Sequence, residues 1–134
     1  MTEFFIPMKP PTTTHQQKKV SVVNGKPIFY EPDKLKAARS KLMGHLYEFA
    51  PETPMSGPVR LRVMWLYEET QKYERGTYKV TKPDLDNVQK LLLDCMTDLG
   101  FWKDDAQVSS MLVEKMYDKV PGIYIKIEEL EVRG

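Results

Sequence analysis

The sequence predicts an α+β fold in which a small mixed β-sheet packs with two main helices. Two segments with the spacing of amphipathic helices lie among short stretches of alternating apolar residues, without the regular rhythm of a doubly wound sheet. The chain has 134 residues, of which 41% are hydrophobic and 29% are charged. These values are typical of an ordinary globular protein, and we expect a single domain over residues 1–134.

The N-terminal third is predicted to contain a strand, a hairpin and the first helix. A short apolar run at 4–6 precedes several prolines and a polar loop. Residues 20–23 and 27–30 flank Asn24-Gly25, a dipeptide that favours the type I′ turn of a β-hairpin. Pro32-Asp33 starts a helix, because proline is tolerated near the first helical position. The apolar face of this helix consists of Leu35, Ala38, Leu42, Leu46 and Phe49.

The remaining elements follow from two further patterns. Apolar residues alternate over 58–67, 107–117 and 123–128, which predicts three strands. Between the first two of these strands, residues 84–99 have helical spacing, and Gly100 is placed where a helix commonly ends. Asp84 stands at the N-cap of this second helix, where we expect its carboxylate to accept backbone N–H bonds.

The charge of the chain is nearly balanced overall but unevenly distributed. Twenty basic and nineteen acidic residues give a formal +1, whereas residues 1–83 carry +6 and residues 84–105 carry −4. A simple polycation is therefore excluded, but a local basic surface is not. Aspartate is a poor helix former, so an acidic segment with six Asp and no Glu needs an explanation. Its acids are Asp84, Asp86, Asp94, Asp98, Asp104 and Asp105.

Metal ligation is one explanation for these aspartates. Asp84 and Asp86 stand two residues apart at a helix start, where both carboxylates can face one hard cation such as Mg²⁺. A third oxygen ligand is available at Asp104-Asp105 if the chain doubles back after the helix. Lys90, one turn beyond Asp86, can pair with that carboxylate or bind a substrate phosphate. Each residue also has an ordinary structural explanation: an N-cap, an i,i+4 ion pair, and turn residues.

Two blocks of this region together resemble the RusA family of Holliday-junction resolvases. The first block is Asp84-Leu85-Asp86-Asn87-Val88-Gln89-Lys90, with Asp94 four residues later, and the second is Gly100-Phe101-Trp102-Lys103-Asp104-Asp105-Ala106-Gln107-Val108. The order and spacing of both blocks are similar to those of the family. Outside 82–117 the likeness is weaker, although Ile6-Pro7 and the following loop resemble the family's proline-rich N-terminal segment.

The resemblance implies a homodimeric, Mg²⁺-dependent endodeoxyribonuclease of DNA recombination and repair that resolves four-way junctions and leaves 5′-phosphates. It implies that Asp84, Asp86 and Asp105 are catalytic and hold the metal, which is Mg²⁺ or in its place Mn²⁺. It assigns Lys90 to catalysis and to the DNA phosphate. Asn87 and Asp104 match neighbouring positions of the motif and are expected to support these ligands.

The DNA contacts follow the motif less closely. Relatives often have a basic residue directly before the first aspartate, whereas here Pro83 intervenes and Lys82 is the nearest cation. Many relatives have arginines in the N-terminal loop, where this chain has Lys18-Lys19. We expect Lys18, Lys19, Lys82 and Lys90 to contact DNA, because phosphate contacts govern affinity and its dependence on salt.

Two other classes of function fit the same residues. One is a dimer that binds branched DNA without cutting it, and the other is a Mg²⁺-dependent enzyme acting on small phosphate esters. Cys95 is the only cysteine, which favours a reducing compartment, and no apolar stretch has the length of a signal peptide or a membrane span. We therefore expect a cytoplasmic protein without membrane contact.

Overall fold

A computed structural model describes residues 1–12, 19–23, 25–30 and 33–132, with the backbone alone described over 19–23 and 26–30. Four strands form one sheet in the order β1-β6-β4-β5. They are β1 (Thr2–Pro7), β4 (Val59–Glu68), β5 (Val108–Asp118) and β6 (Gly122–Glu129). β6 is antiparallel to both β1 and β4, whereas β5 is parallel to β4, so the mixed sheet expected from the sequence is confirmed.

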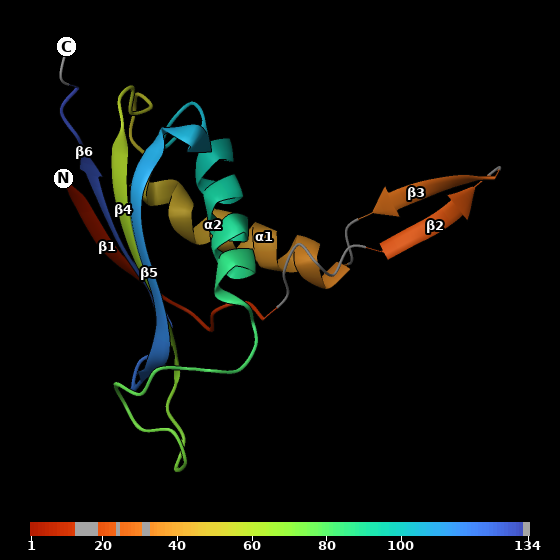
Figure 1. Cartoon of the computed structure of the whole chain (residues 1–134), viewed down its shortest axis with the longest axis horizontal. Coiled ribbons are helices and arrows are strands. Elements are labelled where there is room, and N and C mark those ends of the chain that lie inside the picture. The colour runs from red at the N-terminus through yellow and green to blue at the C-terminus, as the bar shows by residue number, and fades with distance from the viewer. Residues whose placement is uncertain (13–18, 24, 31–32, 133–134) are drawn as a thin grey trace.

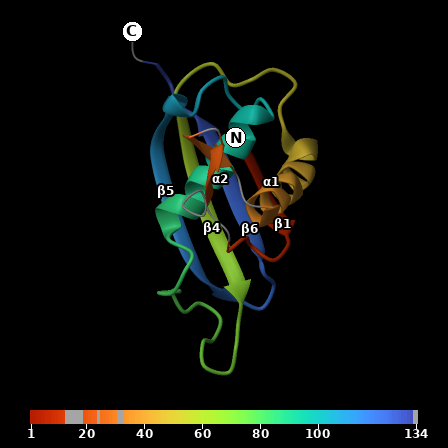
Figure 2. The same ribbon diagram turned by 90° about the vertical axis from the view of Figure 1, so that its right-hand side faces the viewer.

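Two helices, α1 (Asp33–Leu46) and α2 (Leu85–Asp98), lie on the same face of this sheet (Figures 1 and 2). A short 3₁₀ helix, η2 (Tyr47–Phe49), continues α1. Leu35, Leu42 and Leu46 of the predicted apolar face of α1 are fully buried. The alternating residues of β4 supply the opposite side of the core, where Trp65 has no exposed surface. Trp65 and Cys95 were both expected in the core, and both are buried.

The predicted hairpin is present as β2 (Lys19–Val23) and β3 (Lys26–Tyr30), which pair antiparallel. It stands away from the layers of sheet and helices in Figure 1. Gly25 has a φ of +76°, a backbone conformation that glycine adopts without strain in a tight turn. Asn24, the other residue of the predicted turn, lies outside the described residues.

The C-terminal end of α2 shows the expected glycine stop. Gly100 has a φ of +81°, and its N–H bonds to the carbonyl of Thr97 at 3.0 Å. The N–H of Phe101 bonds back to the carbonyl of Met96, also at 3.0 Å, which completes a Schellman motif. The chain then places Phe101 and Trp102 in the core, with the Trp102 indole donating to Thr97 Oγ1 at 2.8 Å.

A long loop, 69–84, joins β4 to α2 and runs along the outer edge of β5. The N–H groups of Gly76 and Lys79 donate to the carbonyls of Tyr117 and Lys115, and the N–H of Tyr117 donates to the carbonyl of Thr77. The ring of Tyr73 stacks on that of Tyr117 with 4.9 Å between centroids. This loop is therefore anchored along part of the sheet edge rather than free. Within the described residues, no helix is both long and apolar enough to span a bilayer.

Gly122 is expected to be essential for the β1–β6 pairing. A Cβ added there would lie 2.4 Å from the carbonyl oxygen of Ile6 and 2.4 Å from the ring of Phe5. We expect Gly122→Ala to lower the free energy of unfolding by about 1–3 kcal/mol, because the backbone of β1 must shift. Urea unfolding followed by circular dichroism measures the change.

Gly44→Ala is the matched control for this prediction. Gly44 lies in α1, and a Cβ there meets nothing within 4 Å. The higher helix propensity of alanine should raise the free energy of unfolding by up to about 1 kcal/mol. A Gly122→Ala protein as stable as the wild type would contradict the close packing of β1 on β6.

Candidate active site

Asp84 precedes α2 in an extended conformation, with φ −65° and ψ 137°. The expected capping bond is absent: the Asp84 side chain accepts no backbone N–H, and that prediction was wrong. Its Oδ2 instead lies 3.5 Å from Nδ2 of Asn87, a long hydrogen bond at best. Because the carboxylate is exposed and not occupied by the helix backbone, its oxygens remain accessible to a ligand.

Asp86 and Lys90 lie on the exposed side of α2, one helical turn apart. Both line a cavity of about 680 Å³ between α2 and β5, and Asp105 lines the same cavity. The remaining walls are formed by Leu85, Gln89, Leu93, Met111 and Val113. Two of the three predicted catalytic acids and the predicted lysine are thus brought to one cavity, although Asp86 and Asp105 are nineteen positions apart in the sequence.

A short 3₁₀ helix, η3 (Asp105–Gln107), fixes the position of Asp105. The carboxylate of Asp104 accepts the N–H of Ala106 at 2.9 Å, and Gln107 Oε1 accepts the N–H of Asp104 at 3.1 Å. Gln107 Nε2 also donates to the carbonyls of Met55 and Gly57. Asp104 therefore serves as a helix cap, and its neighbour Asp105 keeps a carboxylate outside this capping box.

The three predicted metal ligands, Asp84, Asp86 and Asp105, have suitable oxygen atoms but do not form a compact cluster in the described residues. Carboxylate oxygens are the ligands that Mg²⁺ prefers in proteins, and Asp84, Asp86 and Asp105 supply only such oxygens. In the part of the chain that the structure describes, however, no three carboxylate, histidine or cysteine side chains stand close enough together to hold one ion. Asp84 lies at the helix start and is not among the residues that line the cavity.

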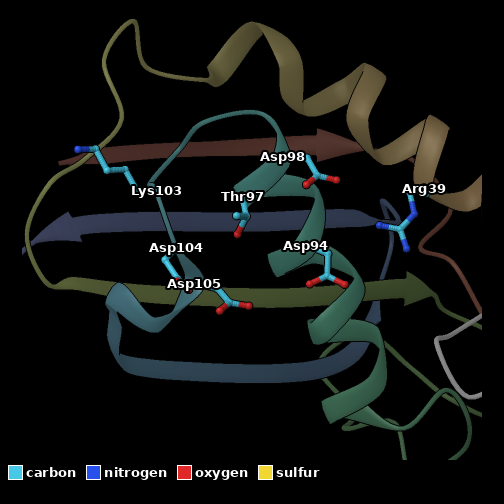
Figure 3. A pocket seen from close by; sticks show the side chains of 7 residues that line it. All are labelled: Arg39, Asp94, Thr97, Asp98, Lys103, Asp104 and Asp105. Atoms are coloured by element: carbon cyan, nitrogen blue, oxygen red, sulfur yellow. The ribbon is translucent and has the colours of Figure 1, made fainter.

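A second cavity, of about 510 Å³, adjoins the first through Asp105 (Figure 3). Asp94, Thr97 and Asp98 extend into it from α2, and Asp105 approaches from η3 with its carboxylate turned toward Asp94. Arg39 of α1 lines the side near Asp94. The sequence did not single out Arg39 as a neighbour of these aspartates, because helical spacing within α2 gives no information about which residues of α1 lie opposite.

The predicted DNA-contacting lysines are only partly described. Lys18 lies outside the described residues, and for Lys19 only the backbone in β2 is described. Lys82 is exposed in the loop that leads into α2. Lys90 lies at the cavity, so of the four predicted contacts it is the one placed beside the predicted acids.

Lys115 is a residue that the sequence did not single out. From β5, its Nζ donates to the carbonyl oxygens of Thr81 and Pro83, at 2.7 and 2.6 Å. Burial lowers the pKa of Lys115, and the positive charge of Lys79 lowers it further, whereas the nearby Asp84 carboxylate opposes this shift. Lys115 thus fastens the chain directly before Asp84. A lysine in an alternating strand gives no signal of this role.

Comparison with known proteins identifies relatives that match most of the chain. The family model described as endodeoxyribonuclease RusA matches residues 7–128. The chain is 33% identical over 130 residues to the crossover junction endodeoxyribonuclease rusA of Lactococcus phage r1t, which covers 96% of this chain and 98% of that protein.

Two further relatives are similar over different lengths. The uncharacterized protein YqaN of Bacillus subtilis is 31% identical over 122 residues, covering 82% of this chain and 84% of that protein. The crossover junction endodeoxyribonuclease RusA of Escherichia coli K12 is 58% identical over 33 residues, which is 25% of this chain and 28% of that protein.

Replacing Lys115 by methionine should loosen the approach to α2. The substitution removes two hydrogen bonds from a charged donor, each typically contributing about 1.5–3 kcal/mol. We expect faster hydrogen exchange of the amides at 79–86, measured by mass spectrometry, with the amides of β4 unchanged. Lys119→Met, at an exposed position just after β5, is the control and should leave exchange at 79–86 as it is in the wild type. Equal protection in both variants would show that Lys115 does not fasten this segment.

Proposed function

This chain belongs to the RusA family of endodeoxyribonucleases, and we propose that it resolves four-way DNA junctions by metal-dependent hydrolysis of phosphodiester bonds. The observation that carries the proposal is the cavity that Asp86, Lys90 and Asp105 share. These side chains combine oxygen ligands for a hard cation with a charge complementary to phosphate. The phage relative that matches nearly the whole chain is named for cutting crossover junctions.

We propose that Asp84, Asp86 and Asp105 hold Mg²⁺, or Mn²⁺ in its place. A bound ion of this kind lowers the pKa of a water ligand and stabilises negative charge on a phosphate. Asp86 and Asp105 line the shared cavity, while Asp84 precedes α2, directly after Pro83, whose carbonyl accepts a hydrogen bond from Lys115. Asn87 supports Asp84 through its side-chain amide, and Asp104 positions Asp105 by capping η3.

Lys90 is proposed to bind the phosphate at which the strand is cut. Its ammonium group lies one turn from Asp86 on the same side of α2, so a phosphate held between them meets one cation and one metal-binding carboxylate. The positive charge of Lys90 beside the phosphate oxygens stabilises the additional negative charge that develops on them during hydrolysis. In the proposed hydrolysis, water attacks the phosphorus and the bond to the 3′ oxygen breaks, so the products are a 3′-hydroxyl and the 5′-phosphate that the resemblance implies.

A homodimer is the assembly that we propose acts on the junction. A four-way junction has nearly two-fold symmetry, and an isologous dimer presents two equivalent sites to two of its strands. Lys18, Lys19 and Lys82 precede the acidic segment, in the part of the chain that carries +6, and are proposed to contact the DNA backbone. The cytoplasmic location inferred from the single cysteine remains a prediction.

Asp86→Asn should abolish cleavage while preserving junction binding. The substitution removes a proposed metal ligand, and loss of comparable charge stabilisation lowers rates by at least about 100-fold. A gel of labelled four-way, flap and linear DNA with Mg²⁺ measures both the product and its dependence on structure. Glu129→Gln, an exposed acid at the end of β6, removes the same charge as a control. Cleavage by Asp86→Asn at the wild-type rate would contradict the proposed role of Asp86 as a metal ligand. If the wild type instead hydrolyses a small phosphate ester with Mg²⁺ but cuts no DNA, the protein is an enzyme acting on small phosphate esters.

Junction affinity should depend on the local charge at Asp86 and on salt, although the net charge of the chain is only +1. In the absence of metal, Asp86→Asn should bind the junction about fivefold more tightly, equivalent to about 1 kcal/mol, because one carboxylate no longer repels the phosphate. Affinity of the wild type should fall steeply between 50 and 200 mM salt, since phosphate contacts release counterions. Fluorescence anisotropy with EDTA measures both. Equal affinities for the two proteins would place Asp86 away from the bound phosphate.

A further inference from the structure

The cavity lined by Asp86, Lys90 and Asp105 also has apolar walls, which binding of a phosphate does not require. Leu85, Leu93, Met111 and Val113 form its apolar part, next to Asp86, Lys90 and Asp105. Met111 is 48% exposed, although it is a large apolar side chain on the strand that also carries the buried Tyr117. A phosphate group gains nothing from apolar surface, whereas a flat, mostly apolar ligand with a few polar atoms does. The volume of the cavity, about 680 Å³, lies within the range of about 300–1,000 Å³ typical of small-ligand sites.

Gln89 provides one polar group in this apolar wall. It is 2% exposed, and it is the one buried polar or charged side chain among the residues whose burial the structure describes. Trp65 Nε1 donates a hydrogen bond to Gln89 Oε1 at 3.0 Å. An indole N–H can only donate, so it requires the amide oxygen on its side and turns the NH₂ group away from Trp65.

The NH₂ group of Gln89 has a poor partner in this structure. Nε2 of Gln89 donates to Sδ of Met111 at 3.6 Å, and a thioether sulfur is a weak acceptor. Gln89 and Met111 both line the cavity, so this contact lies at the cavity wall. A buried amide with two donors and only a sulfur to receive them carries a desolvation cost that a ligand with a better acceptor would remove.

We propose that this cavity receives a nucleobase next to the cleaved phosphate, and that Gln89 recognises it by donating from Nε2 to an acceptor on the base. This inference rests on the proposed cleavage of DNA at Asp86, Lys90 and Asp105. The bases at the branch point of a junction are the least constrained by stacking, so unstacking one costs less than in a continuous duplex. The apolar walls and the polarisable sulfur of Met111 contact its faces. Gln89 is then a specificity-determining residue, and Trp65 is a positioning residue that fixes the amide.

The inference predicts that cleavage depends on one base flanking the cut. A junction library randomised near the branch point, cut to low conversion and sequenced, gives the relative cleavage for each base at each position. We expect the wild type to prefer particular bases at one position adjoining the cut by about tenfold. The double variant Gln89→Met with Trp65→Phe should lose this preference but still cut. Gln89→Met nearly conserves volume, whereas Trp65→Phe leaves a cavity in the core, so circular dichroism must show that the double variant folds. Gln89→Met alone is measured beside it and should also lose the preference.

Two further measurements separate recognition from a structural effect. Trp65→Phe alone keeps the amide but no longer fixes its orientation, so the base preference should weaken without a change in junction affinity. A substrate in which the preferred base lacks its acceptor oxygen should be cut about tenfold more slowly by the wild type and equally well by the double variant. Retention of the wild-type preference by the double variant would overturn the inference.

Leu93→Phe tests the cavity without touching the Trp65–Gln89 pair. A larger side chain narrows the space, and the preference for the flanking base should fall. A change in oligomeric state by sedimentation, with base preference intact, would instead identify the cavity as a subunit contact and overturn the proposal. If the wild type cuts no junction at all, the proposed function fails. If it cuts with no preference at any flanking position, only the inference about Gln89 fails.

Discussion

Strand β5 runs parallel to β4 along ten register pairs, from Val59–Val108 to Glu68–Asp118. Two neighbouring parallel strands cannot be joined by a tight turn, so the chain must travel back along the sheet between them. α2 makes part of this return, and its apolar face is buried against the sheet. Because of this geometry, Asp105 lies in η3, directly before β5, and lines the same cavity as Asp86 and Lys90 of α2. The parallel pairing of β5 with β4 therefore brings Asp86 and Asp105, which are distant in the sequence, to the same cavity.

The helices and strands could be predicted from the sequence, but some of the side-chain contacts between them could not. Alternation in 58–67 and helical spacing in 33–49 and 84–99 identified the buried faces, because burial imposes a period on apolar residues. The resemblance to the RusA family directed attention to Asp84, Asp86, Lys90 and Asp105. Contacts between elements carry no such period, and Lys115, Arg39 and the Trp65–Gln89 pair were therefore found only in the structure.

Asp84 occupies the N-cap position of α2, but its side chain does not make the capping bond that the local rule predicts. Aspartate before a helix usually accepts a backbone N–H, and that is the lowest-energy use of its carboxylate in isolation. Here the main-chain carbonyl of Asp84 accepts the N–H of Val88, while the side chain accepts no N–H of the helix backbone. Local rules are expected to fail where a side chain serves another purpose, and metal binding is the purpose that we propose for this carboxylate.

The loop over 69–84 performs two tasks that are separate in most proteins. Along 76–79 it pairs with the outer edge of β5, which would otherwise offer unpaired backbone groups to another chain. At its end it delivers Asp84 to the start of α2, tied to β5 by Lys115. Surface loops ordinarily tolerate changes in length at little thermodynamic cost. In this loop a residue gained or lost between Lys79 and Asp84 would either break the edge pairing or displace the carboxylate. Natural variation in loop length should consequently concentrate before residue 76.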